Sequence, residues 1–167
     1  MAVVHSGKIF VANTGDSRSI IVQKGGKSKE MSHDHKPQRD DEARRINSLP
    51  GGRIIYYGRW RVQGVLAVSR AIGDVGLKPY VIADPEVLEA TIGPDDIYLV
   101  LATDGLWDVM KNEEVARFVA NCPDFSSVAK ELCYEAKMLG STDNVTCLVV
   151  NLHSSSNKKG KEIKQPY

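Results

Sequence analysis

Three aspartates stand beside segments whose residue types favour β-strands. Asp16 and Asp104 each follow a β-branched, apolar run, and Asp143 comes just before another such run. If these strands are neighbours, the three carboxylates converge at one rim, where they repel and raise one another's pKa values unless a cation lies among them. No His or Cys has comparable spacing, so this oxygen-only set favours Mg²⁺, Mn²⁺ or Ca²⁺ over Zn²⁺.

Each of these aspartates also fits a simple structural role. Gly-Asp-Ser, Asp-Gly-Leu and Thr-Asp-Asn are common turn tripeptides, in which the Asp side chain bonds to its own backbone. Judged singly, each Asp is better explained as a turn residue than as a metal ligand. Spacing alone leaves both interpretations open.

The first half of the chain reads as hairpins followed by a short helix. Short apolar runs predict strands over 8–13 and 19–23, and Lys-Gly-Gly-Lys at 24–27 predicts a second hairpin turn. Asp40 and Asp41 can cap a helix that runs through Arg45 and stops at Pro50-Gly51-Gly52. A further pair of strands is expected over 52–57 and 62–68.

The second half predicts one central strand, two helices and a last strand. The run 97–102 has no polar alternation, as in a strand covered on both faces. Asn112 is expected to cap a first helix, which ends at Pro123. Ser126 or Ser127 is expected to cap a second helix, which ends at Gly140. A last strand is predicted over 145–152. The predicted hairpins come early in the chain and two consecutive helices come late. This order indicates an α+β fold with a mainly antiparallel sheet.

Composition narrows the classes of function. Among 167 residues the charges of the 22 basic and 21 acidic side chains nearly cancel, so no basic surface for binding nucleic acid is expected. Cys122, Cys133 and Cys147 lack C-x-x-C spacing, which argues against a disulfide framework or zinc site and favours a reducing compartment. The longest apolar run, 97–102, is far too short to span a bilayer, and no signal peptide is visible. We expect a soluble, intracellular protein, cytoplasmic or nuclear or both, with no membrane partner.

Six phrases, in order along the chain, resemble the motifs of the metal-dependent 2C-type (PPM family) serine/threonine protein phosphatases. They run from about Lys8 to Leu152. They are Val11-Ala12-Asn13-Thr14-Gly15-Asp16-Ser17-Arg18, Asp34-His35-Lys36-Pro37, Leu66-Ala67-Val68-Ser69-Arg70-Ala71-Ile72-Gly73-Asp74, Asp84-Pro85-Glu86-Val87, Ala102-Thr103-Asp104-Gly105-Leu106-Trp107-Asp108-Val109 and Ser141-Thr142-Asp143-Asn144-Val145-Thr146. The resemblance implies part of a four-layer α-β-β-α sandwich, in which helices flank two mainly antiparallel sheets.

The same resemblance implies the chemistry. Asp104 and Asp143 match two ligands of a metal pair, and Asp16 and Asp108, with Asp104, match a weaker third site. The expected cofactors are therefore Mg²⁺ or Mn²⁺, two ions with a third in addition. Such a pair activates a water that attacks phosphorus in line, so that the aspartates act as ligands and not as nucleophiles. Arg18 and Asn144 are expected to orient the carboxylates, or else to serve as turn and surface residues.

The chain also departs from the family pattern. The family's general-acid His and phosphate-binding Arg have no counterpart, so no catalytic residue is identified here. Residues 1–153 correspond to the C-terminal portion of the catalytic domain with the N-terminal portion absent, and 154–167 read as a disordered polar tail. We expect a phosphatase of phosphoserine and phosphothreonine proteins that is incomplete in this chain, and that pairs with its missing part or another copy. The alternative is an inactive half-domain that acts as a binding or regulatory module.

Three smaller motifs receive structural interpretations. His33-Asp34-His35 lies in a predicted loop and is expected to form a turn rather than an acid/base site. Arg59-Trp60-Arg61 is expected to serve in strand packing or a cation–π contact. Arg70 and Asp74 are expected to form a buried ion pair or a cap.

Overall fold

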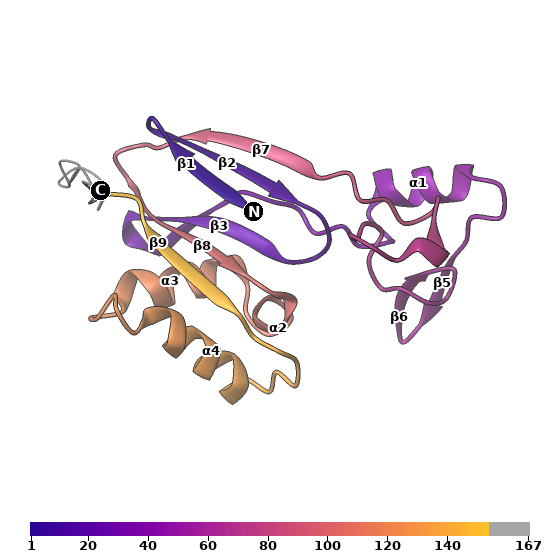
Figure 1. Cartoon of the computed structure of the whole chain (residues 1–167). Coiled ribbons are helices and arrows are strands. Elements are labelled where there is room, and N and C mark those ends of the chain that lie inside the picture. The colour runs from indigo at the N-terminus through magenta and orange to yellow at the C-terminus, as the bar shows by residue number, and fades with distance from the viewer. Residues whose placement is uncertain (154–167) are drawn as a thin grey trace, which may run out of the picture.

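The computed structural model describes residues 1–153, so the predicted tail over 154–167 lies outside the described residues. The described chain forms two lobes joined by a narrow neck (Figure 1). We call residues 34–85 the small lobe, and residues 1–33 with 86–153 the sandwich lobe. No helix among residues 1–153 has the length and apolar character needed to cross a membrane.

The sandwich lobe contains two antiparallel sheets. The first has the strand order β1-β2-β7 and the second the order β4-β3-β8-β9. The strands of the first sheet are β1 (Ala2–His5), β2 (Lys8–Asn13) and β7 (Glu86–Thr91). Those of the second are β3 (Arg18–Gln23), β4 (Lys27–Glu30), β8 (Asp96–Ala102) and β9 (Cys147–Asn151). The strand predicted over 97–102 is thus an interior strand, as expected.

Two apolar clusters fix the layers of this lobe. Ile9 and Val11 of β2 meet Ile21 and Leu99 of the second sheet, which fills the space between the sheets. The opposite face of the second sheet packs on α3 (Asn112–Asn121) and α4 (Val128–Met138), which lie across it (Figure 1). The sheets and helices confirm the expected α+β sandwich class.

The small lobe has its own core around Ile46, Val62 and Val81. It contains α1 (Asp40–Ser48), the hairpin β5 (Ile54–Tyr57) and β6 (Arg59–Val62), and the short 3-10 helix η2 (Val75–Leu77). A 3-10 turn η1 (Lys24–Gly26) joins β3 to β4 in the sandwich lobe, where the hairpin turn was predicted.

The second strand of the small-lobe hairpin differs from the prediction over 62–68. Gly58, with φ at 69°, makes a tight turn directly after Tyr57, so the chain reverses early and β6 begins at Arg59. Gln63 and Gly64 both have positive φ values, and they end the strand where it was expected to begin.

The two late helices form where they were predicted, with one difference at a cap. Ser127 precedes α4 as its N-cap. In α3 the N-cap is Lys111, whose backbone N–H donates to the Glu114 side chain over 2.7 Å. Asn112 is instead the first helical residue, and its side chain does not cap the helix but lies between Arg18 and Glu30 and bonds to both.

Buried charges hold the small lobe together near the neck. Glu42 on α1 is 1% exposed and pairs with Arg45 and Arg70, each at 2.8 Å. This corrects the expected ion pair of Arg70 with Asp74, whereas the alternative of a cap agrees with the position of Asp74 as the N-cap residue of η2. Asp74 lies exposed in a left-handed backbone conformation before η2, whereas Glu42 lies inside the fold where a carboxylate requires a cation.

Candidate metal centre

Strand register brings three of the predicted aspartates to one rim of the sandwich lobe. Arg18 at the start of β3 pairs with Ala102 at the end of β8, and Ala102 pairs with Cys147 at the start of β9. Asp16 lies two positions before the first of these residues, and Asp104 two positions after the second. Asp143 lies in the loop that leads into β9. Asp108, the fourth candidate, caps the C-terminus of the short helix α2 (Asp104–Trp107).

The carboxylates of this rim act on one another. Burial raises the pKa of Asp104, and the negative charges of Asp16, Asp143 and Asp108 raise it further, while Lys36 opposes them. A carboxylate surrounded by other negative charges is stabilised when a cation binds beside it. The sequence prediction that these side chains gather is therefore matched by their electrostatics.

Two basic side chains contact the rim. The Lys36 ammonium pairs with the Asp16 carboxylate, and the Arg59 guanidinium lies 3.2 Å from the carboxylate of Asp108. Sequence reasoning assigned neither contact. The Asp-His-Lys-Pro motif contains Lys36, but nothing in its spacing shows which carboxylate it reaches.

Arg18 does not orient Asp16, which corrects one expectation. Its guanidinium makes a two-pronged contact with Asp34, with both bonds at 2.9 Å, and donates to Asn112 at 2.7 Å. It also lies over the Trp107 ring, 5.2 Å from the centroid. Its guanidinium is thus engaged by Asp34 and by residues of α2 and α3, and it fastens β3 to those two helices.

A close approach of α2 to the loop before β9 brings the segments of Asp104 and Asp143 together. An added Cβ on Gly105 would lie 2.4 Å from the Asn144 carbonyl oxygen. The Ser141 hydroxyl donates to the Gly105 carbonyl at 2.6 Å, and the Thr103 hydroxyl donates to that of Asn144 at 3.1 Å. The backbone N–H of Asn144 donates to the Asp143 carboxylate at 2.6 Å, a contact of the kind expected if these residues stabilise a turn.

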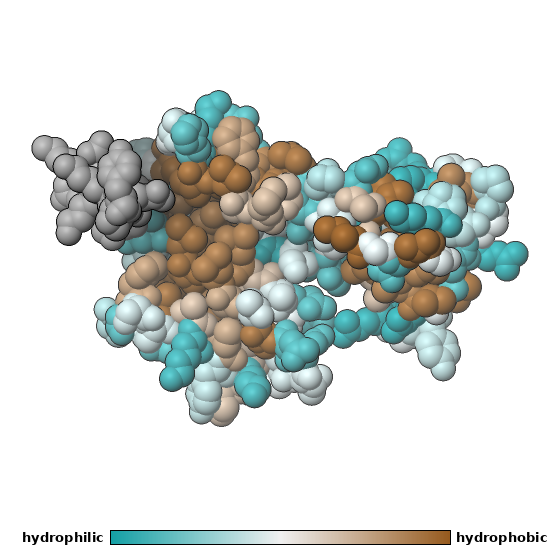
Figure 2. Space-filling model, viewed as in Figure 1, coloured by the Kyte–Doolittle hydropathy of each residue, from teal (hydrophilic) through white to brown (hydrophobic). Residues whose placement is uncertain are grey.

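A cleft of about 540 Å³ opens between the rim and the small lobe. Its sandwich-lobe wall includes Asp108 and Asp143, and its small-lobe wall includes Tyr56, Arg59 and Trp60. Tyr56 and Trp60 meet edge to face at 5.2 Å, which confirms a packing role on the hairpin. In Figure 2 the two lobes meet, and a small opening lies between them.

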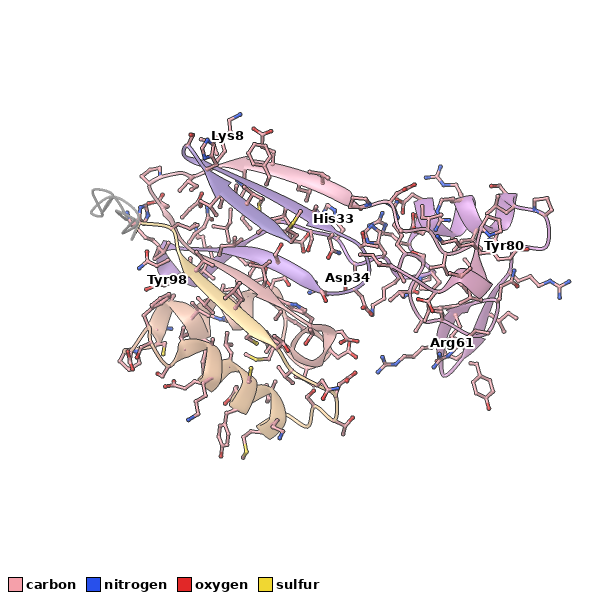
Figure 3. All side chains as sticks on the ribbon, viewed as in Figure 1. Lys8, His33, Asp34, Arg61, Tyr80 and Tyr98 are labelled. Carbon is pink, nitrogen blue, oxygen red and sulfur yellow. The ribbon has the colours of Figure 1, made fainter. Side chains whose placement is uncertain are left out.

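The His33-Asp34-His35 segment has a structural role. Its first two residues lie where the chain enters the small lobe (Figure 3). His35 is fully buried, and the Gly15 backbone N–H donates to its Nδ1 at 3.2 Å. Burial lowers the pKa of His35, and the nearby charges of Arg70 and Arg39 lower it further, so the ring favours its neutral form.

The four aspartates fit a hard divalent cation in the chemistry of their donors. Magnesium and manganese take oxygen ligands, and about six of them each. Within residues 1–153, however, no three Asp, Glu, His or Cys side chains are close enough to form a complete site as they stand. The rim formed by residues 1–153 therefore does not supply a complete metal site by itself.

Comparison with known proteins gives consistent matches. A family model described as Protein phosphatase 2C matches residues 1–145. "Probable protein phosphatase 2C 59" of Oryza sativa subsp. japonica is 47% identical over 156 residues, which cover 93% of this chain and 47% of the relative. "Probable protein phosphatase 2C member 13, mitochondrial" of the same organism is 49% identical over 152 residues, 91% of this chain and 41% of the relative.

A solved structure agrees with these matches. The crystal structure of a phosphatase from a pathogenic strain of Toxoplasma gondii superposes with a TM-score of 0.77 and 30% identity, over 87% of this chain and 49% of that one. The chain thus spans about half the length of the curated relatives it matches.

Proposed function

This chain belongs to the protein phosphatase 2C family, and we propose that the protein hydrolyses phosphoserine and phosphothreonine in proteins, with this chain forming one wall of the active site. The observation that carries the proposal is the meeting of Asp16, Asp104, Asp108 and Asp143 beside the 540 Å³ cleft. Residues 1–153 are the family's C-terminal catalytic portion in this proposal.

The aspartates would serve as metal ligands. Asp104 and Asp143 would hold an Mg²⁺ or Mn²⁺ pair, and Asp16 and Asp108 would hold a third ion together with Asp104. When bound, such ions supply Lewis acidity and an activated water. The chain's own contribution is to fix the carboxylates on strand ends and on the short helix α2, and to place Lys36 and Arg59 where a phosphate in the cleft meets positive charge.

The remainder of the active site would come from another part of the protein. An apolar opening of about 210 Å³ lies between the two sheets, with Val11 on one side and Leu101 and Leu148 on the other. Val4 and Val87 are exposed large apolar residues of the first sheet, and Figure 2 shows apolar surface gathered over the strands of this lobe. We infer that the sheets continue into the rest of the domain, or pair with a second copy. A monodisperse monomer that melts cooperatively would contradict this inference.

The first test is metal-dependent hydrolysis. The 167-residue chain and a longer form that includes the preceding coding sequence are assayed on a phosphothreonine peptide with and without Mn²⁺. We expect turnover by the longer form that needs Mn²⁺ and falls at least about tenfold in Asp104→Asn, because each lost ligand weakens metal affinity. Asp95→Asn is the matched control, since Asp95 is an exposed residue that pairs with Lys24 far from the rim.

A binding module without turnover is the second candidate, and the incomplete coordination shell of residues 1–153 favours it for the chain alone. Binding of the phosphothreonine peptide with no hydrolysis in either form would support this candidate. Manganese-dependent hydrolysis would exclude it. The compartment expected from composition, cytoplasmic or nuclear, stays a proposal that imaging of the tagged protein would test.

A further inference from the structure

Two of the three cysteines lie next to each other in space. Cys133 is on α4 and Cys147 is the first residue of β9, which packs against that helix. The Cys133 thiol donates to the carbonyl of Val145, two residues before the start of β9, at 3.7 Å. The Cys133 thiol is a hydrogen-bonding neighbour of the Cys147 thiol, and both cysteines are half-buried and not joined in a disulfide.

We propose that Cys133 and Cys147 form a dithiol site that reacts with hydrogen peroxide and closes to an intrachain disulfide. In the first step, the Cys133 sulfur attacks the peroxide, the O–O bond breaks, and a sulfenic acid and water form. In the second step, the Cys147 sulfur displaces the hydroxyl group of that sulfenic acid, and its proton leaves with the hydroxyl as a second water. One molecule of hydrogen peroxide is reduced for each pair of thiols oxidised.

The environments of the cysteines set the order of these steps. Burial raises the pKa of Cys147 to about 12, and the neighbouring Cys133 thiol adds to the effect. Cys147 therefore stays protonated at neutral pH and is the resolving partner rather than the first sulfur to react. Closure of the ring is expected to be slow for the same reason.

Cys122 serves as an internal comparison. Its thiol lies near the carboxylate of Glu131, at 3.5 Å, and contacts the Asp124 carbonyl. Cys122 is likewise a free, half-buried cysteine, so it serves as the comparison for Cys133 and Cys147.

The ring closed by this disulfide would contain the loop of Asp143. That loop is already fastened to Gly105 through Ser141 and to Thr103 through the Asn144 carbonyl. A covalent link between α4 and β9 would restrain the loop at its two flanking elements. The redox state of the pair would thereby act on the position of a rim carboxylate.

Peptide mapping tests the proposal directly. The full chain is treated with hydrogen peroxide, free thiols are alkylated, and the protein is digested with trypsin without reduction. Trypsin cleaves after Lys130 and Lys137, so the two cysteines leave in different peptides unless a disulfide joins them. We expect a joined pair whose mass is lower by two hydrogen atoms and which a reductant separates.

Two variants make the result decisive. Cys122→Ser should keep the joined peptides, and Cys147→Ser should lose them while its circular dichroism spectrum stays that of the unmodified chain. Separate peptides, with Cys133 and Cys147 both alkylated or overoxidised, would overturn the proposal. Links that involve Cys122, or that join two chains only, would overturn it as well.

Discussion

Arg59 and Asp108 join the two lobes across the mouth of the cleft, with 3.2 Å between the guanidinium nitrogen and the carboxylate oxygen. Arg59 begins β6 on the small-lobe hairpin, and Asp108 caps α2 beside the rim. The two side chains are 63% and 40% exposed, and exposed pairs of this kind contribute only about 0–1 kcal/mol. The contact therefore positions the hairpin without fixing it firmly.

Arg59→Ala is expected to loosen the hairpin without unfolding the chain. Its neighbour Trp60 should become more accessible to acrylamide, while the free energy of unfolding falls by at most about 1 kcal/mol. Trp107 is buried and should contribute little to the change. Arg44→Ala, an exposed change on α1, is the control. Identical quenching in the Arg59→Ala variant and the unmodified chain would show that the pair does not position the hairpin.

Asp104→Asn should have opposite effects on stability with and without metal. In a chelator the variant should melt above the unmodified chain, because its neighbours Asp16, Asp143 and Asp108 repel the Asp104 charge. With Mn²⁺ in excess the order should reverse, since an ion that binds only the folded state stabilises it by about 2.7 kcal/mol at a hundred times its Kd. Scanning calorimetry measures both. A variant that melts lower in both conditions would contradict the proposed role of Asp104.

Glu42→Gln should strongly destabilise the small lobe. Removing one charge from a buried ion pair typically costs about 3–5 kcal/mol, because the remaining cations are left without compensation. Urea denaturation measures this cost. The control is Glu89→Gln, which removes an exposed carboxylate paired with Lys8, and should change the free energy of unfolding by no more than about 0.5 kcal/mol.

The same variant has a pH signature. Burial alone would raise the pKa of Glu42, but hydrogen bonds from Arg70 and Arg45 outweigh it and lower the pKa from 4.5 to about 2. Because the folded-state pKa is the lower one, the stabilisation is complete above about pH 4.5 and is lost as the pH falls toward 2. The free energy of unfolding should therefore fall less steeply over this range in Glu42→Gln. Parallel curves for both proteins would refute the assignment.

Gly105→Ala should separate the Asp104 and Asp143 loops. The new methyl group would meet the Asn144 carbonyl oxygen at 2.4 Å, and backbone on both sides limits how far either loop can yield. We expect a loss of about 1–3 kcal/mol in the free energy of unfolding together with weaker Mn²⁺ binding. Gly76→Ala is the control, because a Cβ there meets nothing within 4 Å. Equal stability of the two variants would argue against the close approach.

The sequence predicts best those parts of the fold that local patterns determine. The uninterrupted apolar run in β8 and the helical spacing in α3 identified both elements. The strands β1 and β7 were not predicted. Much of their surface is exposed, and apolar and polar residue types do not alternate along their sequences. Their partner is β2, and the pairing of Lys8 with Thr91 joins residues too far apart in sequence for any local pattern to reveal.

The candidate site was also predicted only in part. The positions of Asp16, Asp104 and Asp143 followed from strand ends, since a strand fixes where its last residue emerges. The partners of the basic residues did not follow, because Lys36 and Arg59 reach their carboxylates through tertiary packing. The metal roles of the aspartates remain predictions.

The small lobe leaves and rejoins the sandwich lobe at nearly one point. His33, after β4, lies 2.8 Å from Glu86, the first residue of β7, and Arg39 also pairs with Glu86 at 2.8 Å. A segment whose ends are clamped together can change length at little cost to its host, since doubling a flexible loop costs only about 0.6 kcal/mol. The hairpin of β5 and β6, which forms the outer wall of the cleft, could therefore vary in length while the sandwich lobe stays unchanged, whereas Asp34 and Lys36 could not be exchanged in this way because they contact Arg18 and Asp16.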